Sequence, residues 1–214
     1  MSRVYIYVVD RDLGFAPNPF HGVCTLATCK PGIRSTAKIG DWIFGIGGRS
    51  LKAPGKLIFA MKVSQKLTFN EYWLSEEFKS KKPIPNGSKK VMLGDNIYFQ
   101  NADNSWQQAH SHHSLKDGSL NHHNLNRDTK SKNVLASRHF YYFGSSAPIV
   151  PQDILTEIKY KNNQGHRKFP IGVASKIVSW LETSFPESLN KVSADPFNFD
   201  KSDAHYSVET NRIS

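Results

Sequence analysis

The chain has 214 residues, of which 38% are hydrophobic and 21% charged, enough apolar material for one large domain or a small domain with appendages. No stretch approaches the about 18 consecutive apolar residues of a membrane span, and the N-terminus lacks the pattern of a signal peptide, so we predict a cytoplasmic protein without membrane contact. The 28 lysines and arginines exceed the 18 acidic residues and give a net charge of +10, which favours polyanions as partners.

The first part of the chain predicts short strands joined by turns. An irregular loop rich in Gly, Pro, Asn and Asp is expected over residues 10–22, and a turn over 30–34. We predict strands over residues 4–9, 24–28, 42–46 and 57–63. Thr68 and Glu71 form a T-x-x-E capping box, which predicts a helix over about residues 69–79.

The second part is more polar. Residues 79–90 carry five lysines and no acidic residue, which is typical of an exposed loop. After a strand within 92–99, residues 101–133 form a long polar insertion that is either functional or disordered. The pattern then predicts strands at 134–137 and 140–143 and helices around 152–159 and 172–185. We expect one domain over residues 1–187, followed by a polar, partly disordered tail over 188–214.

Few residues point to catalysis or to a metal. Cys24 lies three residues after His21, so this pair is the candidate for a nucleophile and its base, although an inert core thiol is the alternative that we favour for Cys24. Cys24 and Cys29 supply only half of a four-thiolate zinc site. Five histidines of the polar insertion have the composition of metal ligands without a fixed spacing, and we favour a polar loop over a metal site there: His110, His112, His113, His122 and His123.

Rings, amides and cations in the predicted loops favour a nucleobase ligand. We place its pocket between the loop from Phe15 to Cys24 and the strands that carry Trp42 and Tyr98, with Asn18 reading a base edge and Phe20 stacking on the ring. Trp106 is a further stacking candidate. The alternative is that Asn18 only shapes a turn and Phe20 plugs the core. Seven cations are candidates to contact phosphates: Lys30, Arg34, Lys79, Lys81, Lys82, Lys89 and Lys90.

The segment FAPNPFHGVCTLATCKPGIR at residues 15–34, followed by TAKIGDWIFGIG at 36–47, resembles the nucleotide modification associated domain 2 family of bacteria and their phages. A looser likeness extends over 56–73, 94–99 and 140–144, and covers roughly residues 3–150. The resemblance implies a role with nucleotides or modified nucleic acid, and it does not define a reaction.

A weaker likeness concerns the fold. A Gly-Asp turn before an apolar strand, followed by a strand and a short helix with an aromatic pair, is similar to PUA-like domains such as ASCH and EVE. This likeness implies an α+β fold built on a strongly curved, mixed or mostly antiparallel β-barrel with flanking helices. Several such domains hold a modified or flipped base in an aromatic pocket, but fold alone does not give function.

Our leading hypothesis is a domain that binds a nucleobase, modified or flipped, within nucleic acid or as a nucleotide, in a base-modification or phage-defence context. An enzyme acting on nucleotides or modified DNA through His21 and Cys24 or the histidines of residues 110–123 is the rival. The third alternative is a protein that sequesters a soluble nucleotide. The residues indicate no particular cofactor, and they leave the oligomeric state and the existence of a reaction open.

Overall fold

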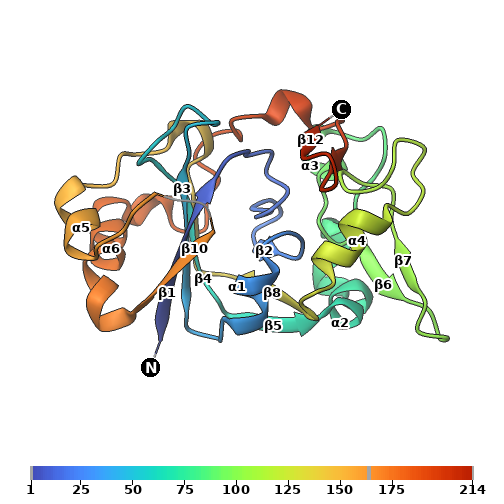
Figure 1. Cartoon of the computed structure of the whole chain (residues 1–214), viewed down its shortest axis with the longest axis horizontal. Coiled ribbons are helices and arrows are strands. Elements are labelled where there is room, and N and C mark those ends of the chain that lie inside the picture. The colour runs from blue at the N-terminus through green and yellow to red at the C-terminus, as the bar shows by residue number, and fades with distance from the viewer. Residues whose placement is uncertain (1, 163–164, 214) are drawn as a thin grey trace. The chain divides into compact units, whose positions relative to one another are not determined.

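The computed structural model describes residues 2–162 and 165–213, and the chain forms two compact units that each draw on several segments (Figure 1). The first unit contains the chain up to Asp12 together with 37–64 and 137–197. The second contains 13–36, 65–136 and the chain from residue 198 onward. The organisation expected from the sequence, one domain over 1–187 followed by a tail over 188–214, stays a prediction.

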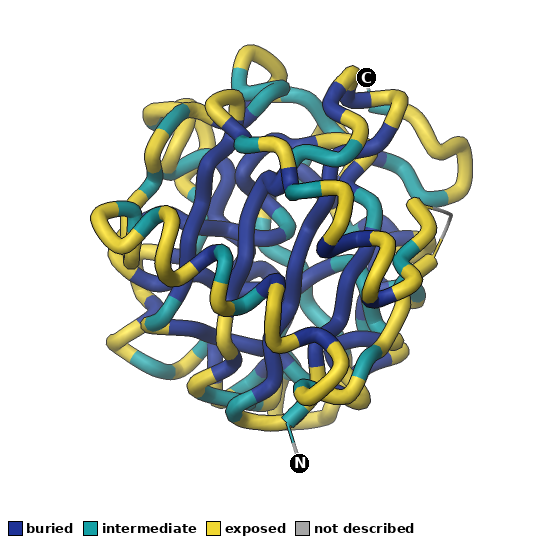
Figure 2. The backbone as a smooth tube through the Cα atoms, turned by 90° about the vertical axis from the view of Figure 1, so that its left-hand side faces the viewer, coloured by how far each residue is buried: buried dark blue, intermediate teal, exposed yellow. Residues whose placement is uncertain are grey.

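A five-stranded mixed sheet forms the core of the first unit. Its strand order is β10 (His166–Pro170), β1 (Arg3–Val9), β3 (Trp42–Gly47), β4 (Leu57–Lys62) and β9 (Phe140–Tyr142). β1 runs parallel to β3, and the other neighbours are antiparallel. β1 and β3 are apolar on both faces, as their continuous hydrophobic runs predict, and the buried segments stand out in Figure 2.

Helices complete the first unit. α6 (Ile171–Ser184) packs on β1 and β10, and α5 (Gln152–Glu157) packs on α6 (Figure 1). The periodicity of α6 is confirmed at Ile177 and Leu181, which are fully buried, whereas Val173 is 50% exposed because the helical geometry is interrupted at the neighbouring Ala174. Two short 3-10 helices, η2 (Gly144–Ser146) and η3 (Pro186–Ser188), lie in the same unit.

Three small sheets form the second unit. One has the order β2 (Cys24–Leu26), β8 (Asn133–Ser137) and β5 (Gln65–Thr68). β6 (Tyr98–Gln100) and β7 (Trp106–Gln108) make a hairpin, and β11 (Tyr206–Ser207) pairs with β12 (Arg212–Ile213). Six short helices accompany them: α1 (Pro31–Thr36), α2 (Phe69–Leu74), η1 (Glu76–Lys81), α3 (Lys89–Met92), α4 (His122–Asp128) and η4 (Phe199–Lys201).

Several local predictions are confirmed and others are wrong. The capping box forms: Thr68 Oγ1 accepts the Glu71 N–H at 3.2 Å, and the Glu71 carboxylate accepts the Thr68 N–H at 2.7 Å. The turn expected at 30–34 is the start of α1, because Pro31 is well suited to the first turn of a helix. The segment from Glu76 to Lys81 is a 3-10 helix that buries Lys81, not part of an exposed loop.

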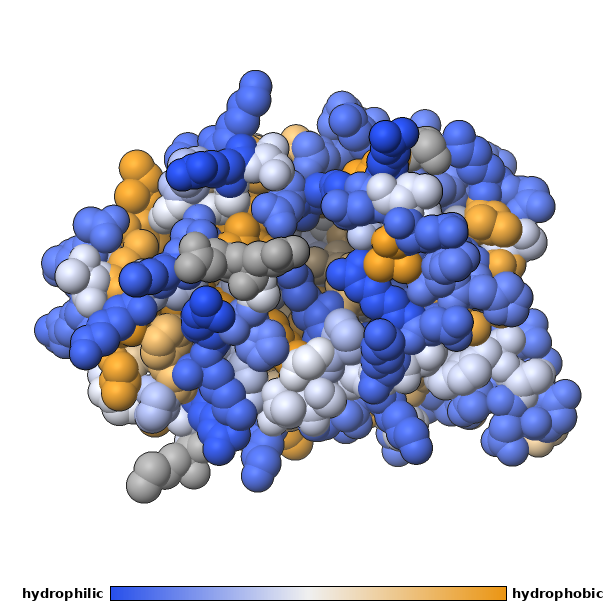
Figure 3. Space-filling model, viewed as in Figure 1, coloured by the Kyte–Doolittle hydropathy of each residue, from blue (hydrophilic) through white to orange (hydrophobic). Residues whose placement is uncertain are grey.

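The expected PUA-like closed barrel is absent from the described residues, although the α+β class is confirmed. The sheets remain separate and open, with five, three, two and two strands. Within residues 2–162 and 165–213, we find no helix of the length and apolarity that a bilayer span requires. Hydrophilic side chains cover most of the face shown in Figure 3, as the composition leads one to expect.

Candidate functional site

Cys29 occupies a strained turn in the second unit, between the end of β2 and the start of α1. Its φ of +55° is in the left-handed region, which a residue with a side chain adopts only when its surroundings hold it there. Its N–H donates to Asp128 Oδ1 at 2.7 Å, and its carbonyl accepts from Arg34 Nε at 2.8 Å. Two buried charged side chains therefore fix the backbone of a partly exposed cysteine.

The Cys29 thiol is the first of three side-chain groups that contact one another in series. Its Sγ lies 3.9 Å from Nε2 of His113, and Nδ1 of the same ring lies 2.7 Å from Asp128 Oδ2. A nucleophile beside a base that a third group orients is the arrangement that activates a catalytic cysteine or serine. This thiol–imidazole–carboxylate cluster of Cys29, His113 and Asp128 is the candidate active centre.

The surrounding fold holds the imidazole and the carboxylate in place. Asp128 ends α4, a helix whose N-cap Asn121 accepts two N–H groups through Oδ1. Asn124 of the same helix donates to the His113 carbonyl at 2.8 Å, and the Tyr98 hydroxyl donates to Asp128 Oδ2 at 3.0 Å. Such supporting contacts lock the orientation of the groups that would react.

Electrostatics favours a charged pair inside this cluster. Burial lowers the pKa of His113, but the charge of Asp128 and the hydrogen bond to it outweigh this effect and raise the pKa to about 9. Burial likewise raises the pKa of Asp128, whereas the charges of His113 and Arg34 and the hydrogen bonds bring it below its ordinary value. At neutral pH the ring is therefore an imidazolium paired with a carboxylate.

Two arginines lie near the cluster and differ in role. The Arg34 guanidinium is fully buried and donates to the carbonyls of Asp128 and Asn133, so it serves the fold. Arg127 is partly exposed and donates to the Tyr206 hydroxyl at 3.1 Å. Burial lowers the pKa of Arg127, but interaction with Cys29 and the hydrogen bond to Tyr206 outweigh this effect and raise the pKa.

The pair proposed from the sequence, His21 and Cys24, has a different environment. Cys24 lies in β2 with no exposed surface, and burial raises the pKa of its thiol to about 12. His21 is exposed, and partial burial together with the charges of Lys81 and Lys90 lowers its pKa. Cys24 thus has the inert, protonated thiol of a core residue.

The predicted ligand residues fall into both units. Trp42 belongs to the first, whereas Phe15, Asn18, Phe20, Tyr98 and Trp106 belong to the second. Asn18 is fully buried; its Nδ2 donates to the Leu93 carbonyl, and its Oδ1 accepts from Lys81 and from the Phe20 N–H.

The rings predicted to stack on a base pack on other side chains. Phe15 lies with its centroid 4.7 Å from that of His113, and so forms part of the wall of the active centre. Trp106 packs edge-on against Phe69, and Phe20 lies 5.8 Å from Phe199. A role for Phe15, Phe20, Trp42 or Trp106 in binding a base stays a prediction.

The predicted phosphate-contacting cations divide into buried and exposed ones. Lys81 has no exposed surface, and its Nζ donates to Asn18 Oδ1 and to the carbonyls of Asn18, Phe20 and Val23. Arg34 is buried as described above. Those with at least part of their surface exposed are Lys30, Lys79, Lys82, Lys89 and Lys90.

The five histidines of the polar insertion separate into three places. His113 belongs to the active centre, His110 and His112 line a pocket, and His122 and His123 open α4 on the surface. Among residues 2–162 and 165–213, no three His, Cys, Asp or Glu side chains converge as metal ligands.

The sequence does not predict the candidate active centre because its members are distant in the chain. It indicates Cys29 only as half of a zinc site, and it gives no sign of Asp128. The available signal was a cysteine in a Thr-Cys-Lys-Pro-Gly turn, with histidines and acidic residues elsewhere, and a pattern of this kind identifies a nucleophile only when the fold is known.

Comparison with known proteins gives one match. The family model described as nucleotide modification associated domain 2 matches residues 1–203. Neither a curated protein nor a solved structure matches the chain. Because the family model covers nearly the whole chain, including all three residues of the candidate active centre, the chain belongs to the nucleotide modification associated domain 2 family.

Proposed function

We propose that this protein is an enzyme that acts on a nucleotide or on a modified base in nucleic acid, with Cys29 as its nucleophile. The observation that carries the proposal is the contact series from Cys29 Sγ to His113 Nε2 at 3.9 Å and from His113 Nδ1 to Asp128 at 2.7 Å. The nucleotide context of the substrate comes from the family.

Each residue of the cluster has its own role in the proposed reaction. Because the His113 ring is already an imidazolium at neutral pH, it acts as the acid: the Cys29 thiol gives its proton to water, and Sγ as a thiolate forms a bond to an electrophilic carbon of the substrate. The imidazolium, held by Asp128, gives its Nε2 proton to the leaving group as the bond from the carbon to that group breaks. The neutral ring then takes a proton from the water that attacks the same carbon, and the carbon–sulfur bond breaks to restore the thiolate. Arg127, which is partly exposed and precedes Asp128 in α4, offers a guanidinium for a phosphate or carboxylate of the substrate.

Intact-protein mass spectrometry combined with nucleoside analysis tests this proposal. The protein would be incubated with deoxynucleoside monophosphates and with oligonucleotides that carry hydroxymethylated or unmodified pyrimidines. We expect a covalent adduct on Cys29 or a changed nucleoside, lost in Cys29→Ala and strongly reduced in His113→Gln, whereas the matched control Cys24→Ala keeps it if it folds. Identical products from wild type and folded Cys29→Ala would refute a nucleophilic role.

A second candidate function is binding of nucleic acid without chemistry, which a surface cluster favours. Phe199 is partly exposed, and Lys89 Nζ lies 5.4 Å from the centroid of its ring. Lys90 Nζ lies 5.9 Å from the ring of Phe20, which packs beside Phe199. An aromatic face with cations next to it suits a stacked base and its phosphate.

Salt-dependent binding tests this candidate. Replacing Lys89 and Lys90 with Gln should weaken polynucleotide binding for every sequence and reduce the log-log salt slope by about one unit per lost contact. Lys176→Gln is the control because Lys176 is exposed, pairs with Glu157 in the first unit and is not among the cations predicted to contact phosphates. An unchanged slope would assign Lys89 and Lys90 to solubility, and affinity independent of polymer length would favour sequestration of a free nucleotide.

A further inference from the structure

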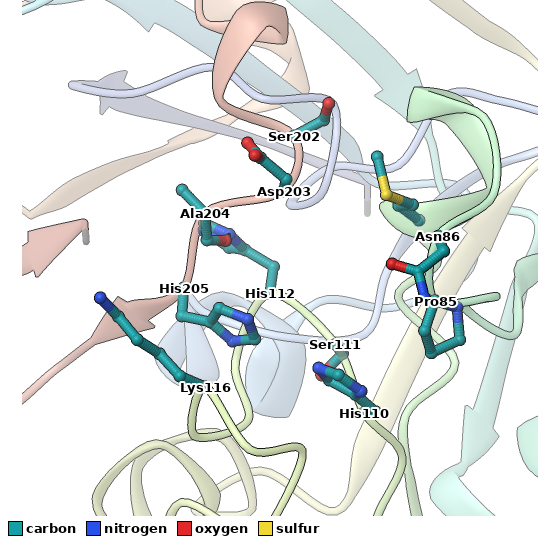
Figure 4. A pocket seen from close by; sticks show the side chains of 11 residues that line it. Pro85, Asn86, His110, Ser111, His112, Lys116, Ser202, Asp203, Ala204 and His205 are labelled. Carbon is teal, nitrogen blue, oxygen red and sulfur yellow. Dashed lines mark hydrogen bonds between the residues drawn. The ribbon is translucent and has the colours of Figure 1, made fainter.

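The second unit contains a pocket that is separate from the thiol cluster. Its volume is about 250 Å³, larger than the about 150 Å³ cavity that accommodates a benzene ring. In Figure 4 the tail residues Ser202–His205 face Pro85 and Asn86 across the pocket, with His110 and Ser111 between them. Cys29, His113 and Asp128 are not among its lining residues.

Ser111 belongs to the turn that forms the floor of the pocket, and its side chain is packed inside that turn. The residue is only 5% exposed, and its Oγ has no hydrogen-bond partner among the described residues. Because this oxygen is shielded from solvent, Ser111 contributes to the pocket through the position of its backbone and not through its hydroxyl. The backbone of Ser111 is fixed, since its N–H donates to Ser114 Oγ at 3.1 Å and its carbonyl accepts the Ser114 N–H at 3.0 Å.

The other lining groups fit an aromatic ring that carries an anion. The imidazoles of His110 and His205 lie nearly parallel, with centroids 5.6 Å apart, and Met92 adds an apolar surface. Asn86 contributes an amide that pairs with the edge of a base, and Lys116 contributes a cation. Asp203 at the exposed rim accepts from amino groups and disfavours a bare anion.

The C-terminal segment builds one wall of this pocket. Tyr206 N–H donates to the His112 carbonyl at 2.8 Å, and His205 Nδ1 lies 3.1 Å from the Ser114 carbonyl. Asn124 Oδ1 accepts a hydrogen bond from the Val208 N–H of the same segment at 2.8 Å. The wall is therefore tied to the turn that carries Ser111, and the pocket is preformed.

From the paired imidazoles, the amide of Asn86 and the single lysine of the lining, we infer that this pocket binds a nucleoside monophosphate. The base lies against His110, His205 and Met92, its edge meets Asn86, and its phosphate meets Lys116. This site goes beyond the proposed reaction, because it does not include the thiol cluster and binds its ligand without covalent chemistry.

Calorimetric titration with the four deoxynucleoside 5′-monophosphates tests the inference, with the matching nucleosides and inorganic phosphate as comparison ligands. We expect at least one monophosphate to bind the full-length protein with a dissociation constant below about 1 mM. Lys116→Gln and His205→Ala should each weaken binding by about tenfold, the usual loss for one charge-assisted or stacking contact. Lys176→Gln should bind like the wild type, because Lys176 is exposed, belongs to the first unit and is not among the lining residues of the pocket.

The outcomes separate this site from the proposed catalysis. Cys29→Ser should bind the nucleotide as the wild type does, whether or not the protein proves to be an enzyme. No binding by any monophosphate, unchanged affinity in Lys116→Gln and His205→Ala, or equal affinity for inorganic phosphate would each overturn the inference. Loss of binding in a folded Cys29→Ser protein would also overturn it, because the ligand would then belong to the thiol cluster.

Discussion

The His113–Asp128 pair makes a quantitative prediction about stability and pH. Histidine has an ordinary pKa of 6.5, and the folded protein holds the His113 pKa at about 9, a rise of about 2.5 units. At about 1.4 kcal/mol per unit, the pair stabilises the fold by about 3 kcal/mol when the ring is charged. Because the folded state binds this proton more tightly, the contribution is complete below pH 6.5 and is lost as the pH rises through about 9.

Urea unfolding of wild type and His113→Gln at a series of pH values measures this effect. The difference in unfolding free energy between the two proteins should be largest near pH 6 and should shrink by about 3 kcal/mol by about pH 9.5. Titration of the groups that both proteins share contributes equally to the two unfolding free energies, so it cancels in their difference. As a control, His123→Gln should have little effect, since His123 and Glu209 form an exposed pair. A difference that stays constant with pH would refute the charged pair.

Three further predictions concern neighbouring features of the second unit. In the native protein, iodoacetamide should label Cys29 and leave Cys24 unmodified, as peptide mass spectrometry would show; equal labelling would contradict the burial of Cys24. Burial lowers the pKa of Lys81 to about 8, so the folded state loses this proton at a lower pH than the unfolded state does. The unfolding free energy of the wild type relative to Lys81→Met should therefore rise from about pH 8 towards 10.5, the opposite sign to His113, and a fall would refute the assignment. Thr68→Ala should lower the unfolding free energy by about 1 kcal/mol through loss of the cap on α2, and denaturant unfolding that matches the wild type would show that the cap contributes little.

The elements that the sequence predicts well are those whose signals are local. The capping box at Thr68 and Glu71 involves residues three positions apart, and it forms as expected. The apolar runs of β1 and β3 likewise indicate buried strands. Strand pairing is not local, and neither segment shows that β1 pairs in parallel with β3 in an open sheet, so the barrel inferred from a resemblance is not confirmed.

The candidate site depends on distant contacts, and this explains why its residues were not predicted. Cys29 and His113 are 84 positions apart, and Asp128 follows 15 positions after His113. Asp128 stands in a polar segment where nothing marks it as buried. Lys81 was misassigned for a related reason: in a run of lysines each side chain looks solvated, and only the loop carbonyls of Asn18, Phe20 and Val23 make one of them internal.

Buried cations explain how an irregular loop can hold a reactive cysteine. Residues 13–23 and the turn around Cys29 have few partners in sheets, so their carbonyl groups need other donors. Lys81 supplies them for residues 18–23, and Arg34 supplies them for Cys29, Asp128 and Asn133. Burying a cation without such acceptors would cost several kcal/mol. In each network the carbonyl groups therefore stabilise the buried cation, and the cation in turn stabilises the conformation of the loop. The Arg34 network joins the Cys29 turn to the end of α4. It thereby fixes the backbone that positions the Cys29 thiol relative to the Asp128 carboxylate.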